Sequence, residues 1–450
     1  MLNVAAIADL RKALRGQLLT PDAAGYDTTR KVFNGMVDKR PALIARCVSR
    51  TDVAMCVNFA RDHDVPLSVR GGGHNFAGKS VCHAGLMLDL SLMKGITVDP
   101  SRSVARAQTG LTLGEFDRET QKYGLATTLG VATTTGIAGL TLGGGYGWLA
   151  GRYGLACDNL LWAEIVTADG KIHECSSQEN AELFWGLRGA GANFGVVTEL
   201  EYTLHPLSMV LGGPIFYPLS GEAFRFYDEF ARSAPDELTL LAAAMTGPDG
   251  SPAFAAVACY CGDAAAGEKV LAPLRTFGTP TADLIQLRPY VQMQSLFDPM
   301  NPPGRRYYNK THNVSKIGTE TIDTVLRYMG KAPTASTMIA FQQFHGAAGR
   351  VPTDGTAFPH RYDHHVTWIN PIGDDPADDA RLIQWGRECW EGLKPFADPG
   401  VYVNALEDAL EDGERPVREV YGANYERLRA LKREYDPSNL FRQNSNIDPA

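Results

Sequence analysis

Residues 73–80 read Gly-His-Asn-Phe-Ala-Gly-Lys-Ser and match the phosphate-binding pattern G-x-x-x-x-G-K-[ST] at every fixed position. The apolar stretch 65–69 stands where the strand before such a loop belongs. A phosphate loop must then run directly into a helix, whose N-terminal amides hold the phosphates. Here Gly85 would fall in the second turn of that helix, and residues 86–90 predict a short buried strand instead.

This strand also comes too early for a nucleotide-binding enzyme. A crossover of a dozen or more residues, usually a helix, must separate two parallel neighbouring strands. Asp89 at the end of the strand therefore resembles a magnesium-binding aspartate by coincidence. We interpret the phosphate-loop match as accidental and assign no role to Lys79 and Ser80.

The composition is that of a globular chain with more than one domain. At 450 residues the chain is too long for one ordinary core, and apolar residues make up 44% of it and charged residues 21%. The net charge of -8 argues against nucleic acid or an acidic membrane as a partner, and no apolar run is long enough to span a bilayer. Residues 1–19 show no secretion signal, so we expect a cytoplasmic protein.

The eight cysteines are irregularly spaced and do not indicate a disulfide framework. Cys259 and Cys261 form the one close pair, and their apolar surroundings predict two thiols on one strand face rather than a metal site. We therefore expect free thiols and assign no residues to a metal.

Glycine is concentrated at 71–85, 130–154 and 186–195, which predicts loops whose shape the backbone defines. Regular elements separate these loops, so the first half predicts an α+β fold. The expected elements are helices at 49–62 and 113–123 and a hairpin of strands 161–167 and 171–174.

From residue 206 onward the pattern changes to longer alternating segments. Strand-like runs and helical runs follow one another, at 238–245, 254–260, 222–234 and 320–329. The tail predicts one strong helix, because apolar residues recur every three to four positions from Val417 to Leu431 and Pro416 suits a first turn. The helix is expected to stop at Tyr435.

A second nucleotide pattern, G-x-G-x-x-[GA], fits residues 145–150, and Glu164 lies at a plausible distance beyond it. That fingerprint needs a strand immediately before it. What precedes is a long glycine-dense stretch at 133–144, which we interpret as a loop. Such a loop can press backbone amides against a pyrophosphate without a Rossmann helix, so we expect nucleotide binding of another kind.

Several motifs taken together resemble the berberine-bridge-enzyme-like FAD-linked oxidases of the vanillyl-alcohol-oxidase superfamily. The resemblance runs from about residue 38 to residue 447 and is greatest to a bacterial branch that oxidises amine-type substrates and tailors natural products. The motifs are RGGGHNFAG at 70–78, GGGYG at 143–147, RYGLACDNL at 152–160, LFWGLRGAGANFG at 183–195 and the tail 424–441.

The resemblance implies an α+β fold with two domains. A two-part FAD-binding domain would be formed by residues 1–205 and completed by the C-terminal segment 401–450. A substrate-binding domain at 206–400, built on an antiparallel sheet covered by helices, would be inserted between them.

The resemblance also implies that His74 is bonded covalently to the 8α-methyl of FAD. A second, cysteinyl link is not expected, because its position holds Ala132, and Cys157 is interpreted as structural. The remaining FAD-binding positions carried over are Arg70, Gly71, Gly72, Gly73, Asn75, Gly78, Thr135, Gly136, Gly139, Gly143, Gly144, Gly145, Tyr146, Gly147, Asn159, Val197, Asn444 and Asn446.

In such enzymes a substrate C–H gives a hydride to the flavin, and a base usually removes a proton from the neighbouring O–H or N–H. The family's Tyr-x-Asn-Tyr motif reads Tyr402-Val403-Asn404-Ala405 here, so the usual tyrosine base is absent. Tyr402 and Asn404 stay as catalytic candidates. Tyr308 and Lys310 are further candidates, and we interpret the pair His364 and His365 as a surface feature.

The resemblance thus implies an FAD-dependent oxidase acting on a small or medium-sized alcohol, amine or secondary metabolite, with molecular oxygen as the second substrate and hydrogen peroxide as a product. A monooxygenase-like tailoring enzyme and a flavoprotein without turnover are the alternatives. The substrate, the choice between oxidase and dehydrogenase, and the oligomeric state stay open.

Overall fold

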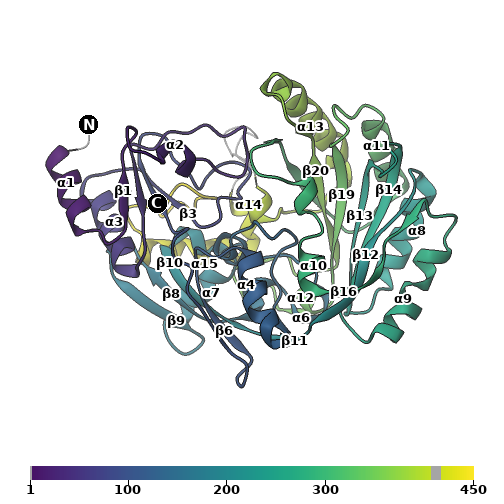
Figure 1. Ribbon diagram of the computed structural model, residues 1–450, viewed down its shortest axis with the longest axis horizontal. Coiled ribbons are helices and arrows are strands. Elements are labelled where there is room, and N and C mark those ends of the chain that lie inside the picture. The colour runs from purple at the N-terminus through teal and green to yellow at the C-terminus, as the bar shows by residue number, and fades with distance from the viewer. Residues whose placement is uncertain (1–2, 407–416) are drawn as a thin grey trace.

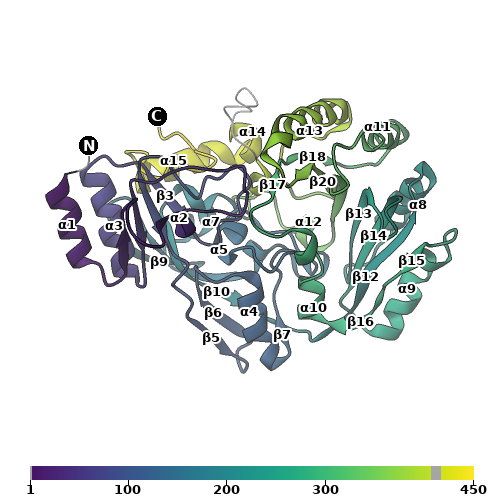
Figure 2. The same ribbon diagram turned by 45° about the horizontal axis from the view of Figure 1, so that its top comes forward.

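The computed structural model describes residues 3–406 and 417–450. The chain forms two lobes (Figure 1). The N-terminal part and the yellow C-terminal segment share one lobe, and the teal and green middle of the chain forms the other. Figure 2 shows α14 (Val417–Tyr421) and α15 (Tyr425–Tyr435) lying along the first lobe beside α7 (Ala181–Ala190).

The first lobe begins with a four-stranded sheet. Its order is β1 (Gln17–Leu19), β2 (Leu43–Arg46), β4 (Leu86–Asp89) and β3 (Leu67–Arg70). The predicted strand at 86–90 is confirmed, but the reasoning about its connection was wrong. β3 and β4 are parallel neighbours, and the loop 71–85 joins them without a helix. The crossover needs length rather than helical structure, and this loop is long enough.

A five-stranded antiparallel sheet packs next to it. Its order is β5 (Ile96–Asp99), β6 (Val104–Gln108), β10 (Val196–Thr203), β8 (Leu160–Val166) and β9 (Ile172–Ser176). The predicted hairpin is β8–β9, and the two predicted helices are α3 (Arg50–Asp62), capped by the Ser49 side chain, and α4 (Leu113–Thr120). The stretch predicted as a loop before 145 contains the short helix α5 (Ile137–Leu142). No strand directly precedes the motif at 145–150, as expected for a site that is not of the Rossmann type.

The second lobe is one large antiparallel sheet. Its order is β15 (Ala282–Asp283), β12 (Met209–Pro218), β14 (Pro252–Tyr260), β13 (Leu238–Thr246), β19 (Met338–Phe344), β20 (His364–Asn370) and β18 (Lys310–Val314), with β16 (Gln286–Pro289) also paired to β12. Four helices cover its outer face, namely α8 (Gly221–Arg232), α9 (Ala264–Thr276), α11 (Thr319–Met329) and α13 (Asp379–Leu393). The α+β class and the helix-covered antiparallel sheet are confirmed.

Alternate residues of the central strands face the two sides of this sheet. Leu240, Ala242 and Ala244 pack under the helices, whereas Leu241 and Ala243 face the first lobe. Both sides are buried, which explains why these strands read as continuous apolar runs. Cys259 and Cys261 lie together in the cluster on the inner side, as predicted, and all eight cysteines are free and buried.

The C-terminal segment closes the first lobe. Val420, Tyr421, Leu428 and Leu431 join a core whose other members are mostly buried apolar residues between Ala105 and Leu204. The predicted single helix is interrupted by a 3-10 turn at Gly422–Asn424, and Pro416 lies outside the described residues.

A buried ion pair fixes the end of this segment. Lys432 donates to Asp436 at 2.6 Å and to the Asn193 carbonyl at 2.8 Å, and both charged side chains are fully buried. The tail is thereby tied to the loop after α7, which brings residues 443–445 back into the first lobe. Among the described helices, none combines the length and apolarity that a bilayer crossing requires.

The loop after β3 presses directly against the start of α5. A Cβ added to Gly72 would overlap the backbone nitrogen of Gly136, and a Cβ at Gly136 would overlap that of Gly72. Only glycine at both positions allows the two backbones this approach. Two segments far apart in sequence are thus held in contact.

We predict that Gly136→Ala pushes these two segments apart and destabilises the protein by about 1–3 kcal/mol, the usual cost of overpacking. The measurement is the thermal midpoint of unfolding, which should fall. Gly330→Ala is the control, because its Cβ would meet only ordinary contacts at 3.5 Å. Equal behaviour of the two variants would show that the contact at Gly136 is not required.

Asp117 on α4 is a buried carboxyl where this helix meets α10 (Tyr290–Gln294). Its Oδ2 accepts a hydrogen bond of 2.9 Å from Gln294, and burial raises the pKa of Asp117 from 3.8 to about 7. At a pH between these two pKa values, the folded protein keeps a proton on Asp117 that the unfolded chain has already lost. Stability from this group is present at low pH and is lost as the pH rises towards 7.

We predict that Asp117→Asn flattens this dependence. Between pH 5 and pH 8 the wild type should lose more unfolding free energy than the variant, by about 2–3 kcal/mol at most. Urea unfolding of both proteins at the two pH values measures the difference. Parallel pH profiles would contradict a raised pKa at Asp117.

Candidate active site

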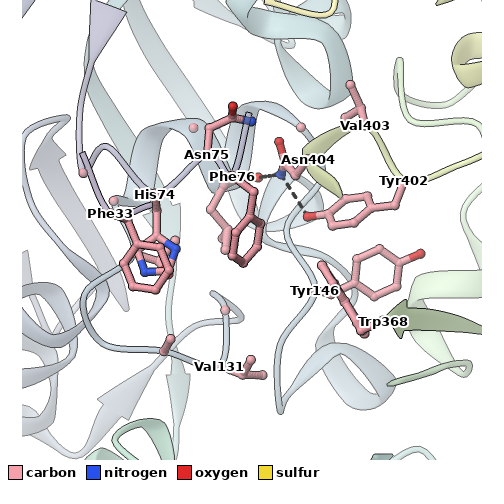
Figure 3. Close-up of a pocket in the computed structure, with 18 of the residues that line it drawn as sticks. Phe33, His74, Asn75, Phe76, Val131, Tyr146, Trp368, Tyr402, Val403 and Asn404 are labelled. Carbon is pink, nitrogen blue, oxygen red and sulfur yellow. Dashed lines mark hydrogen bonds between the residues drawn. The ribbon is translucent and has the colours of Figure 1, made fainter. Parts of the chain in front are cut away.

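A cavity of about 400 Å³ lies between the two lobes, and residues from several distant parts of the chain line it. One wall is the loop after β3 and the glycine-rich stretch 130–143, and a second is the C-terminal stretch 443–445. The inner face of the large sheet forms the opposite wall. Residues 402–404 lie between these walls, with Asn404 and Tyr402 directed towards one another (Figure 3).

Most of the residues expected at the cofactor and catalytic positions line this cavity. They are Gly71, Gly72, Gly73, His74, Asn75, Thr135, Gly136, Gly139, Gly143, Tyr146, Tyr402, Asn404 and Asn444. Ala132, the position of the absent cysteine, lines it as well. The structure therefore brings together motifs that stand more than 300 residues apart in the sequence.

His74 is held between a ring and a hydroxyl. Its imidazole stacks on Phe33 with ring centroids 3.8 Å apart, and its Nε2 lies 3.0 Å from Thr134 Oγ1. Desolvation lowers the pKa of His74 to about 4, so the imidazole is neutral at physiological pH. A neutral imidazole has one nitrogen with a free lone pair, which is the form that can act as a nucleophile.

Asn34 joins the His74 loop to the second lobe. Its amide nitrogen donates to the carbonyls of Phe76 at 2.7 Å and of Tyr307 at 2.8 Å, and its Oδ1 accepts from the Tyr307 amide. Tyr307 in turn stacks on Phe33. Phe33, Asn34 and Thr134 were missed by the sequence analysis, because they belong to no glycine motif and act only through the tertiary contact.

Tyr402 and Asn404 form a hydrogen-bonded pair whose polar atoms can be assigned. Asn404 Nδ2 donates to the Leu140 carbonyl and to the Tyr402 hydroxyl, both at 2.9 Å, and the Gly145 amide also donates to that hydroxyl, at 3.2 Å. The carbonyl can only accept, which fixes the orientation of the amide. Within the described chain, the Tyr402 proton and Asn404 Oδ1 keep no partner, so a donor and an acceptor are left side by side.

Gly143 is needed for this arrangement. A Cβ at Gly143 would overlap the side chain of Asn404, so glycine lets the amide lie against the backbone. Burial raises the pKa of Tyr402 to about 12, and the phenol therefore keeps its proton at neutral pH. Ala405 is buried in an apolar cluster that also contains the Tyr402 and Tyr146 rings.

Tyr146 lines the cavity with its ring, but its hydroxyl is engaged elsewhere. His364 Nδ1 lies 2.7 Å from the Tyr362 carbonyl and must donate to it, so Nε2 accepts from the Tyr146 hydroxyl at 3.2 Å. His364 and His365 are both buried, at 2% and 4% exposure, and our interpretation of them as a surface pair was wrong. They lie in β20, where alternation turns one to each side of the sheet.

Tyr308 and Lys310 do not reach the cavity. Lys310 lies in β18 opposite Ile369, and its Nζ is 5.5 Å from the Trp390 ring of α13. Tyr308 packs against Gly386 of the same helix. Both side chains are on the outer, helix-covered side of the sheet, so the structure gives no support to the catalytic role expected for them.

Several other predicted positions support the site without lining it. Arg70 donates to the carbonyls of Thr29 and Lys31 and pairs with Asp89, which also pairs with Arg46. Asn159 donates to the carbonyls of Tyr153 and Leu155. Gly78, Gly144, Gly145, Gly147, Val197 and Asn446 also lie outside the cavity lining.

Lys79 and Ser80, to which we assigned no role, line the cavity. Lys79 Nζ is 3.2 Å from Ser445 Oγ, and Ser80 Oγ is buried with no hydrogen-bond partner among the described residues. Asn444 Oδ1 is likewise buried with no hydrogen-bond partner among the described residues. Buried polar atoms without partners and a lining rich in glycine fit an extended dinucleotide. Its phosphates need hydrogen bonds and a close approach of the backbone. The residues present therefore fit FAD.

Two family models match the chain. The FAD binding domain matches residues 41–176, and the model described as berberine and berberine like matches residues 401–448. Both ranges contribute residues to the cavity lining, including His74 from the first and Asn404 from the second.

The full-length relatives agree with these matches. The chain is 35% identical to an FAD-linked oxidoreductase of Dictyostelium discoideum, over 93% of this chain and 91% of the relative. It is 33% identical to (R)-6-hydroxynicotine oxidase of Paenarthrobacter nicotinovorans, over 97% of both chains.

Solved structures show the same fold. The structure of 6-hydroxy-D-nicotine oxidase from Arthrobacter nicotinovorans has a TM-score of 0.88 at 31% identity, over 97% of this chain and 99% of that one. A xylooligosaccharide oxidase from Myceliophthora thermophila has a TM-score of 0.85 at 23% identity, over 99% of both chains, and shows the shared fold alone. From these matches, the chain belongs to the berberine-bridge-enzyme-like family of FAD-linked oxidoreductases.

Proposed function

We propose that the protein is an oxidase that removes a hydride from the carbon next to a hydroxyl or amino group of a small molecule. The observation that carries this proposal is the free donor and acceptor left by Tyr402 and Asn404 in the cavity. A hydroxyl group both accepts and donates a hydrogen bond, so it matches this pair. The pair lies between the glycine-walled part of the cavity and the inner face of the sheet.

FAD, when bound, would accept the hydride and pass its electrons to molecular oxygen. The loop 71–75, the stretch 135–143 and residues 443–445 would hold it. We propose that His74 forms a single covalent bond to it. The neutral imidazole, the Phe33 stack and the alanine at position 132 support this proposal.

The chain's own residues orient the substrate and exclude water. The Tyr402 hydroxyl would donate to the reacting oxygen, and Asn404 Oδ1 would accept its proton in a hydrogen bond. Because the pKa of Tyr402 is raised to about 12, this phenol is poorly suited to act as a general base. Its role is therefore to position the substrate.

The direct test is a screen of alcohols and amines with the purified yellow protein. Anaerobic bleaching of the flavin by a substrate, followed by peroxide release when air is admitted, is the expected result. Bleaching without peroxide would indicate a dehydrogenase, and flavin that no substrate bleaches would indicate a flavoprotein without turnover.

We predict that the wild-type flavin stays in the pellet after acid precipitation and that the flavin of His74→Ala is released to the supernatant. The reason is that only a covalent bond survives unfolding in acid. His83→Ala is the matched control, because His83 lies in the same loop, is exposed and does not line the cavity. Acid-stable flavin in His74→Ala would exclude this attachment.

We predict that Asn404→Ala slows anaerobic flavin reduction by about tenfold to a hundredfold, because it removes the acceptor and frees the Tyr402 hydroxyl to rotate. Stopped-flow absorbance at saturating substrate measures the rate, and the flavin content checks that the site is intact. A change of less than about threefold would place Asn404 away from the reacting atoms.

A further inference from the structure

The sheet wall of the cavity carries no formal charge. Most of the side chains that form it are small or apolar, among them Leu241, Ala243, Ala255, Val257 and Ala340, and its two amides are Gln342 and Asn370. Within the lining that the structure describes, Lys79 alone is charged at neutral pH, and it lies at the cofactor end beside Ser445. A charged group placed against this wall would lose its water without meeting a counter-ion.

The carboxylate next to this wall is already engaged. Asp298 follows the lining residue Phe297, but its Oδ1 accepts from the Thr133 amide at 3.0 Å and its Oδ2 from the Thr133 hydroxyl. Asp298 thus anchors the glycine-rich stretch to the second lobe. It is not positioned to pair with a substrate ammonium group.

Gln342 supplies a fixed hydrogen-bond donor in this apolar wall. The Trp368 indole Nε1 lies 3.1 Å from Gln342 Oε1, and an indole N–H can only donate. The amide oxygen must therefore face Trp368. The Gln342 NH₂ group has no hydrogen-bond partner in the described chain, and it is the part of the amide left for a ligand.

The wall also leaves room for a flat ring. Ala243, Ala255 and Ala340 are neighbours on adjacent strands, because Ala243 pairs with both of the others. Trp368 stands beside Ala340 on the next strand and also lines the cavity. Met300 lines the cavity and is 40% exposed, and Asn301 lines the cavity beside it.

We infer that the substrate is a neutral molecule with an apolar, aromatic framework and one hydrogen-bond acceptor that meets the Gln342 NH₂ group. This inference rests on the proposed function and narrows its substrate class. Sugars are excluded, since each hydroxyl that loses water without a new partner weakens binding by about tenfold. Protonated amines are excluded by the missing counter-ion. Gln342 is thus a specificity-determining residue.

Equilibrium binding to the anaerobic holoenzyme tests the class without requiring turnover. The probes are 4-methoxybenzyl alcohol, its protonated amine counterpart 4-methoxybenzylamine at pH 7, and glucose, each followed through the change in visible flavin absorption. The neutral alcohol should bind at least about tenfold more tightly than either of the others. Tighter binding of the amine or the sugar, or no binding of the neutral alcohol, overturns the inference.

Two variants test Gln342 itself. Gln342→Met keeps the length but removes the donor, so binding of 4-methoxybenzyl alcohol should weaken by about tenfold while 4-ethylbenzyl alcohol, which lacks the ether oxygen, changes by less than about twofold. Gln342→Glu replaces the donor by a carboxylate, which cannot donate to the ether oxygen, so it should weaken binding of 4-methoxybenzyl alcohol by more than about tenfold. Equal losses for both alcohols in Gln342→Met, with normal flavin content, would show a packing role only.

The two proposals fail in different ways. If the protein binds the neutral alcohol but no substrate bleaches the flavin, the proposed oxidase activity is wrong and the binding class stands. If sugars or cations bind and bleach the flavin, the oxidase activity stands and the substrate class is wrong.

Discussion

The contact between Gly72 and Gly136 sets the distance between the two segments that form the cofactor side of the cavity. Each glycine occupies space that a Cβ of the other would need. His74 follows one glycine by two residues, and Gly139 and Gly143 follow the other, so both groups reach the same cavity. A wider separation would move the imidazole away from Thr134, which lies 3.0 Å from it.

The second lobe completes the site from the opposite side. Asn34 and the stacked rings of Phe33, His74 and Tyr307 join the His74 loop to the second lobe. The ion pair of Lys432 and Asp436 returns the C-terminal tail to the first lobe. Between them, Tyr402 and Asn404 present one donor and one acceptor. The site is therefore assembled from several segments that are far apart in the chain, none of which is sufficient alone.

Much of the fold and part of the site were predictable. Apolar spacing predicted α3, α8 and the hairpin β8–β9. A helix or strand with one buried face has apolar residues at a regular spacing in the sequence. Apolar spacing failed for the β3–β4 connection, where a loop replaces the usual helix, and for α5, whose glycines resemble a loop. His364 and His365 look polar in sequence but are buried, since their contacts lie in other strands.

The sequence by itself determined the family and the FAD chemistry that goes with it, and it singled out His74 as a candidate, because glycine spacing around a histidine is a local property of the chain. The tertiary structure decided which candidates meet. It placed Tyr308 and Lys310 under the helices, turned Tyr146 towards His364 and brought Lys79 into the cavity. The side of a strand that faces a cavity depends on pairing register, and register is set by partners distant in sequence.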